Sequence, residues 1–134
     1  MKDEELLLNL NQRLLEAIVG CDYQTYNELC KDDMSCIEPE SNYQVVVGKD
    51  FHQFYFEAHV PTGTPVNVSM ARPHVRFLAN GSVAVVSYIR LDQVIAEDGK
   101  PVTTQTSETR VWELLPGGTF ARSGTWQHCH FHKS

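Results

Sequence analysis

Three basic side chains in the second half of the chain each stand two positions from a large aromatic residue. The pairs are Tyr88 with Arg90, Arg110 with Trp112, and Phe131 with Lys133. Residues two apart in a strand share a face, and large aromatic residues usually mark the covered face of a sheet. Strand geometry therefore predicts three inward cations and a deep basic pocket. The alternative is an ordinary sheet margin, where the stems lie on the aromatic rings and the charged ends reach water.

A pocket that gathers several cations needs negative charge close by, because unpaired charges are costly to bury. Glu108 shares the face of Arg110 and is the internal candidate, whereas a small carboxylate or an acidic peptide is the external one. Arginine can bind a carboxylate through two parallel hydrogen bonds, but Lys133 offers only a point charge. His52 and Tyr55 belong to a predicted helix over the concave side of the sheet, where they would line the pocket mouth or form an ordinary packed helix face.

A second group of polar side chains alternates along the last predicted strand, at His128, His130 and His132. Alternate histidines on one face can bind zinc or copper. No acidic partner stands at the spacing of a metal motif, so we interpret them as polar residues on an outer or interface face. We expect no metal and no cofactor.

Motifs for catalysis are missing from the sequence. It has no Ser-His-Asp order, no nucleophile elbow, no phosphate-binding Walker loop and no HExxH helix. We therefore expect a protein that is not an enzyme. The alternative is a small-molecule dehydratase or isomerase that uses one pocket carboxylate and one histidine or tyrosine, as ketosteroid-isomerase-like proteins do.

Length and charge narrow the class of protein further. The 134 residues have a mass of 15.2 kDa and suit a single domain over 1–134. A net charge of −6, from 11 basic and 17 acidic residues, argues against binding to nucleic acid. No apolar run is long enough to cross a bilayer, and the N-terminal region does not resemble a signal peptide. Four cysteines without a CxxC motif fit a cytoplasmic protein with reduced thiols.

The elements that must position these residues fall into two groups, helices first and strands second. Leucines at helical spacing predict an N-terminal helix that ends near Gly20, and Asp22 can cap a second helix that runs to Cys30. Asp50 and Gln53 resemble a capping box that opens a third helix, from Phe51 to about His59. Short extended segments are expected at 34–37 and 43–47.

Turn signals at 80–81, 98–99 and 116–118 separate four longer strands, at about 66–78, 83–95, 102–115 and 119–133. Helices followed by a run of long antiparallel strands indicate the α+β class. In that class a curved antiparallel sheet wraps onto the helices and leaves a concave side.

Six stretches of the chain resemble the association (hub) domain of calcium/calmodulin-dependent protein kinase II. They lie at 37–40, 48–57, 73–75, 87–91, 107–112 and 126–132, and they follow the order of the family over nearly the whole chain. The resemblance implies a nuclear-transport-factor-like cone, with the long N-terminal helix held in a strongly curved sheet. It also implies a homo-oligomer of two stacked rings, usually of twelve or fourteen subunits.

The resemblance also assigns residues to the pocket of the family. Arg90, Arg110 and Lys133 match its three arginines, and His52 and Tyr55 match its histidine and tyrosine. That pocket is associated with small carboxylates and with acidic or regulatory peptide segments. Lys133 departs from the usual arginine.

Further departures concern the loops and the length of the chain. The hairpin 115–124 looks longer than that of the family, and the loop 61–65 looks shorter. The sequence has no kinase domain and no calmodulin-binding segment, so we expect a scaffold whose partner is a second copy of itself. Full-length kinase subunits are further candidate partners.

Overall fold

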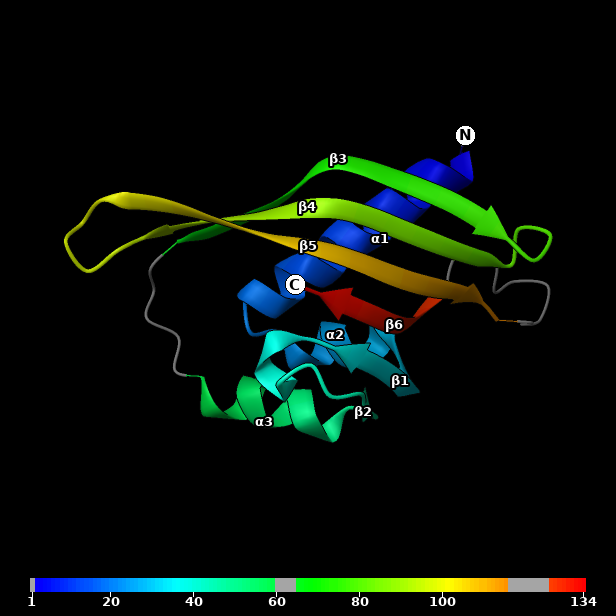
Figure 1. Ribbon diagram of the computed structural model, residues 1–134, viewed down its shortest axis with the longest axis horizontal. Helices are drawn as coiled ribbons and strands as arrows, with labels where there is room; N and C mark the ends of the chain where they lie inside the picture. Colours follow the sequence, from blue (N-terminus) through cyan, green and yellow to red (C-terminus); the bar gives the residue numbers. More distant parts are fainter. Residues whose placement is uncertain (1, 60–64, 116–125) are drawn as a thin grey trace.

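The computed structural model describes residues 2–59, 65–115 and 126–134 (Figure 1). Within these ranges the helices come mainly before the long strands, as predicted. The elements in chain order are α1 (Lys2–Val19), α2 (Tyr23–Leu29), β1 (Cys30–Ile37), the 3-10 helix η1 (Pro39–Ser41), β2 (Val46–Val47), α3 (Asp50–Ala58), β3 (Val66–Leu78), β4 (Val83–Ile95), β5 (Pro101–Leu114) and β6 (Trp126–Lys133). None of these helices has the length and apolar character that crossing a membrane requires.

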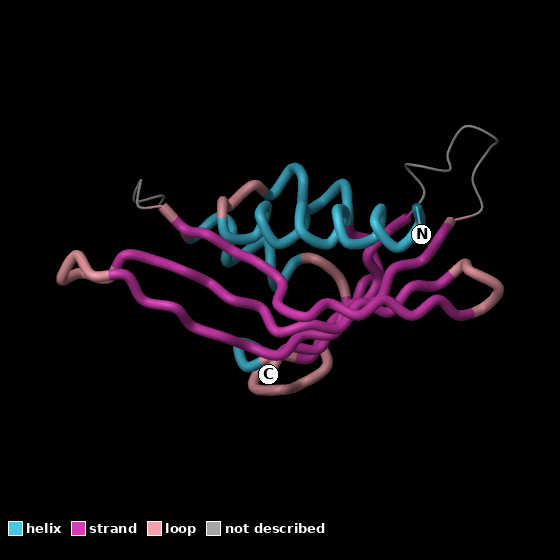
Figure 2. Tube along the Cα trace, turned by 90° about the horizontal axis from the view of Figure 1, so that it is seen from above, coloured by secondary structure: helices cyan, strands magenta, loops and turns pink. Residues whose placement is uncertain are grey.

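The six strands form one sheet in the order β2-β1-β6-β5-β4-β3. Four of the five strand pairs are antiparallel, as predicted, but β1 and β6 are parallel. No hairpin joins β1 to β6, because the chain passes through α3 and the β3–β5 strands between them, so no turn imposes an antiparallel pair. The sheet is curved, and α1 lies across one of its faces (Figure 2).

Helix α1 packs into the core through buried leucines and through one buried polar residue. Leu7, Leu14 and Leu15 are fully buried, and burying a leucine side chain contributes about 1.5–3 kcal/mol. Asn11 is buried among them and accepts a hydrogen bond of 3.0 Å from Nε1 of Trp112 on β5. This bond fixes the helix against the concave side of the sheet, where the candidate site lies.

The helix boundaries confirm one predicted cap and correct another. Asp22 caps α2, because its side chain accepts a hydrogen bond of 3.1 Å from the backbone N–H of Thr25. The capping box predicted at Asp50 and Gln53 is wrong. Lys49 already has helical backbone angles and precedes α3 without a side-chain cap, and its carbonyl accepts from the N–H of Gln53.

The long strands agree closely with the prediction. The bounds of β3 and β4 match, and Ala79, Asn80 and Gly81 all adopt positive φ in the turn between them. The extended segment predicted at 43–47 shortens to β2. The predicted strand start at 119, most of the hairpin 115–124 and most of the loop 61–65 lie outside the described residues.

A β-bulge in β6 changes which side chains face the core. Val111 on β5 pairs with His130, whereas the next residue, Trp112, pairs with His128, so Cys129 is an extra residue in β6. His128 is fully buried, and His132, beyond the bulge, is exposed. The prediction that the three histidines share one outer or interface face is therefore wrong.

Candidate functional site

The five predicted site residues line one pocket of about 280 Å³. Lys133 lies at the end of β6, and Arg90 and Arg110 point inward from β4 and β5. His52 and Tyr55 come from α3. The two arginines are only 8% and 1% exposed, which excludes the sheet-margin alternative for them. The inward direction predicted from strand parity is thus confirmed, while a role in ligand binding stays a prediction.

Glu108 is the centre of the buried charges. One of its carboxylate oxygens accepts from Nη1 of Arg90 at 3.0 Å, and the other accepts from Nε of Arg110 at 2.9 Å and from the hydroxyl of Tyr88 at 2.5 Å. Burial alone would raise the pKa of Glu108, but the two guanidinium groups outweigh it and lower this pKa to about 2. The internal partner that the sequence suggested is therefore present and ionised.

The other cations of the pocket also contact carboxylates. Asp92 accepts two hydrogen bonds from Arg90, at 2.7 and 2.9 Å. Lys133 donates to Glu40 at 3.0 Å and lies 3.7 Å from Glu38. Three cations thus meet four carboxylates among the described side chains, and these side chains carry no surplus of positive charge.

His128 contacts one of these cations from within the core. It lies 3.3 Å from Nη1 of Arg110, whose guanidinium stacks 4.2 Å from the ring centre of Phe131. Burial, with Arg110 adding to it, lowers the pKa of His128 well below its ordinary value. The ring is therefore neutral, its Nε2 accepts from Arg110, and its Nδ1 faces the thiol of Cys30 at 3.3 Å. Strict alternation along β6 would place His128 on the opposite face from Phe131, but the bulge at Cys129 breaks that alternation. The contact between His128 and Arg110 was therefore not predicted.

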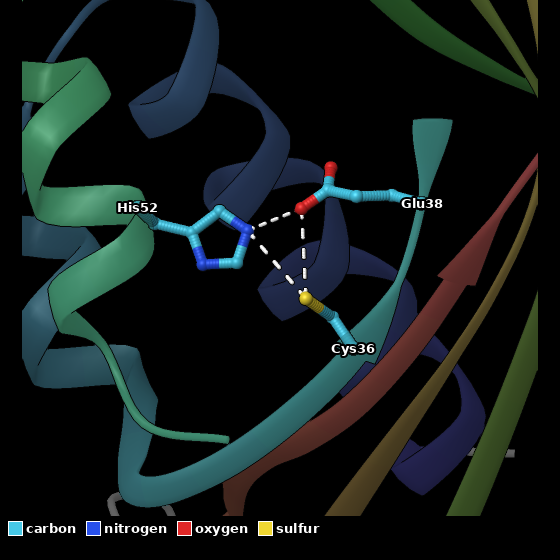
Figure 3. A group of neighbouring side chains, drawn as sticks. All are labelled: Cys36, Glu38 and His52. Atoms are coloured by element: carbon cyan, nitrogen blue, oxygen red, sulfur yellow. Dashed lines mark hydrogen bonds and ion pairs between the residues drawn. The ribbon is translucent and has the colours of Figure 1, made fainter. Parts of the chain in front are cut away.

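Cys36, Glu38 and His52 converge on one another in the same region (Figure 3). Nε2 of His52 lies 2.5 Å from Oε2 of Glu38, and Sγ of Cys36 lies 3.5 Å from that oxygen and 3.7 Å from that nitrogen. Cys36 and Glu38 come from the end of β1 and the residue after it, and His52 comes from α3. This cluster was not predicted from the sequence, although a cysteine and a glutamate two residues apart at the end of a predicted strand were a usable signal.

Burial and charge set the protonation of the cluster. Burial would raise the pKa of Glu38, but the hydrogen bond and charge of His52, with the charge of Lys133, lower it. Burial, with the nearby charge of Glu38, raises the pKa of the Cys36 thiol to about 12. A carboxylate held ionised in this way is a weak base, so the cluster does not favour the isomerase alternative.

Structural comparison first defines the class of protein. An NTF2-like protein from Cytophaga hutchinsonii matches with a TM-score of 0.74 at 18% identity, covering 100% of this chain and 98% of that one. This likeness shows the fold alone. The chain therefore has the α+β, nuclear-transport-factor-like architecture that the sequence predicted, in which the sheet is curved but not closed.

Sequence comparison then defines the family. The family model of the calcium/calmodulin dependent protein kinase II association domain matches residues 3–134, and the chain belongs to this family. It is 37% identical over 129 residues to the delta subunit of the type II kinase from Oryctolagus cuniculus, and it spans 23% of the length of that subunit. The CaMKII hub homology domain of Chlamydomonas reinhardtii matches with a TM-score of 0.86 at 42% identity, covering 98% of this chain and 97% of that one.

Proposed function

We propose that this chain is a non-enzymatic oligomerisation module. The observation that carries the proposal is the family match over residues 3–134, since the family is that of an association domain. The whole chain 1–134 is then a single hub domain. Its function is self-association, and the fold serves as a scaffold.

The assembly we propose is a homo-oligomer of two stacked rings, with twelve or fourteen copies of the chain, in the cytoplasm. A ring needs apolar contacts between protomers, and the chain keeps several large apolar side chains exposed, among them Val47 and Phe54. Full-length kinase subunits of the same family are candidate partners, because a shared interface would let the two kinds of chain mix in one ring.

Mass measurement in solution tests this proposal. Light scattering and native mass spectrometry of the full chain at micromolar concentration should report a multiple of 15.2 kDa that corresponds to a ring. A monomer of 15.2 kDa over the same concentration range would contradict the proposal. Mixing with an association domain from a full-length kinase, followed by native mass spectrometry, then tests whether hybrid rings form.

The pocket adds a binding function to the scaffold in this proposal. Its ligand is a small carboxylate or the acidic end of a peptide, bound by Arg90, Arg110 and Lys133 with His52 and Tyr55 at the mouth. Because each cation already contacts a carboxylate of the chain, the ligand binds by exchange. The pair between Lys133 and Glu40 is the one to open, since the side chain of Glu40 is 43% exposed and exposed ion pairs contribute little.

A further inference from the structure

We propose that Cys36, Glu38 and His52 form a binding site for one zinc ion. The three side chains supply a thiolate, a carboxylate and an imidazole, which are the ligand types that zinc takes in proteins. Cys36 lies in β1, which has a neighbouring strand on each side in the sheet, Glu38 directly follows β1, and His52 lies on α3. All three ligand atoms lie within 4.8 Å of one another.

The distances between the ligand atoms fit a tetrahedral ion. Bond lengths of about 2.3 Å to sulfur and about 2.05 Å to nitrogen or oxygen place the sulfur about 3.6 Å from each of the other two ligand atoms. The observed separations are 3.5 Å to Glu38 and 3.7 Å to His52. The nitrogen and the oxygen, now 2.5 Å apart in a hydrogen bond, must separate to about 3.3 Å. The separation of the Glu38 oxygen from the His52 nitrogen is therefore the main adjustment that the ion requires.

The same geometry argues against a catalytic relay through the cysteine. In such a relay one histidine nitrogen faces the thiol and the other faces the carboxylate. Here Nε2 of His52 faces both partners, and its Nδ1 is buried without a hydrogen-bond partner among the described residues. Sγ of Cys36, Oε2 of Glu38 and Nε2 of His52 instead converge on a common centre, as the ligands of one metal ion do.

The surroundings leave one coordination position of the ion open, and one neighbouring charge opposes binding of the ion. Glu38 and His52 line the pocket, so the fourth position faces the cavity and takes a water or a carboxylate. Zinc binding releases the thiol proton and any proton shared by His52 and Glu38 to water, and the thiolate and carboxylate then neutralise the ion. The ammonium group of Lys133, which lies 3.7 Å from Glu38, repels the zinc ion and so weakens its binding.

Cobalt(II) is the probe for this site, because it takes the place of zinc and reports its ligands in its absorption spectrum. Titration of the reduced full chain with cobalt chloride should produce a thiolate-to-cobalt band that saturates at one ion per chain, and zinc chloride should abolish it. Cys36→Ser should remove the band and weaken zinc binding at least about 10- to 100-fold, the loss that mutation of an outer-shell partner already causes. Lys133→Gln should strengthen zinc binding a few-fold, because it removes the nearby cation.

The matched control is Cys129→Ser on β6. Burial also raises the pKa of this thiol to about 12, but it lies outside the cluster and donates to the carbonyl of Val111. This variant should keep the cobalt band. A band that survives in Cys36→Ser, or a wild-type chain without a thiolate band, would overturn the site.

A second measurement needs no variant. X-ray absorption of the zinc-loaded wild-type chain should find one sulfur at about 2.3 Å and otherwise nitrogen or oxygen ligands. A shell without sulfur would overturn the proposal even if Cys36→Ser failed to fold.

Light scattering on the same samples distinguishes the metal-site proposal from the ring proposal. A monomer that shows the thiolate band contradicts the ring alone. A ring without the band contradicts the metal site alone.

Discussion

At the scale of single residues, buried carboxylates organise the pocket. Glu108 contacts two arginines, and Glu38 lies between Lys133 and His52. The cations were predictable because β4 and β5 keep one register through Arg90 and Arg110, so alternation assigns their faces correctly. The two carboxylate partners of Lys133 were not, because Glu38 and Glu40 reach it across more than 90 residues of chain and no local pattern encodes that contact.

Replacing Glu108 with glutamine should destabilise the fold. Arg110 is fully buried, and breaking a buried ion pair leaves an uncompensated charge that costs about 3–5 kcal/mol. Urea unfolding of Glu108→Gln at about pH 7 should show this loss. Glu40→Gln is the matched control, since its exposed pair with Lys133 should contribute about 1 kcal/mol or less. Equal stability of the two variants would contradict the central role of Glu108.

The lowered pKa of Glu108 also determines how the stability of the fold responds to acid. The pKa of Glu108 is about 2 in the folded chain and near 4.5 ordinarily, so its ionised form favours folding at every pH above 4.5. That contribution falls progressively as the pH decreases from 4.5 toward 2. Urea midpoints of the wild type should decline over this range, and those of Glu108→Gln should decline less. An equal decline in both chains would assign acid sensitivity to other groups.

Ligand exchange at Lys133 gives a prediction for the pocket. Removing the competing carboxylate by Glu40→Gln should raise the affinity for acetate or benzoate a few-fold, since the exposed pair contributes up to about 1 kcal/mol. Lys133→Gln should lower the affinity by about tenfold, the effect of one charge-assisted hydrogen bond. Isothermal titration calorimetry measures both. Unchanged affinity in both variants would place the carboxylate elsewhere.

At the scale of elements, local patterns predicted the long strands correctly but not the start of α3, and pairings between strands far apart in the sequence were not predicted. The bounds of β3 and β4, and the turn at Asn80, follow from local alternation and turn chemistry. The parallel pairing of β1 with β6 and the bulge at Cys129 arise where strands far apart in the sequence meet.

The bulge matters for the site as well as for the fold. It lets His128 and Phe131 face the same core and contact Arg110 together, which uninterrupted alternation would forbid. The cluster of Cys36, Glu38 and His52 has a similar origin, because the position of α3 relative to β1 brings His52 to Cys36 in the strand and to Glu38 just after it.

At the scale of the whole molecule, strongly exposed apolar side chains belong to the segment 43–47, which ends in β2, and to the middle of α3. Tyr43, Val45 and Val47 are 53%, 64% and 69% exposed, and Phe54 on α3 is 65% exposed. We call these four residues the edge patch, because β2 is the edge strand of the sheet and lies beside α3 (Figure 1). Exposed apolar side chains on an edge strand and beside it favour an interaction surface, and in a self-associating chain the partner is a second copy.

The edge patch can be tested by introducing charge. The double variant Val45→Glu and Val47→Glu should weaken each contact between protomers roughly 100-fold, since burying two valines contributes about 3 kcal/mol, and light scattering should report a smaller assembly. Val102→Glu is the control, because Val102 is 40% exposed on the β4–β5 hairpin, which extends away from the edge patch (Figure 1). Circular dichroism checks that each variant is folded. A double variant that keeps the full wild-type mass would exclude the edge patch from the ring contacts, whereas loss of mass in Val102→Glu alone would assign those contacts to the hairpin.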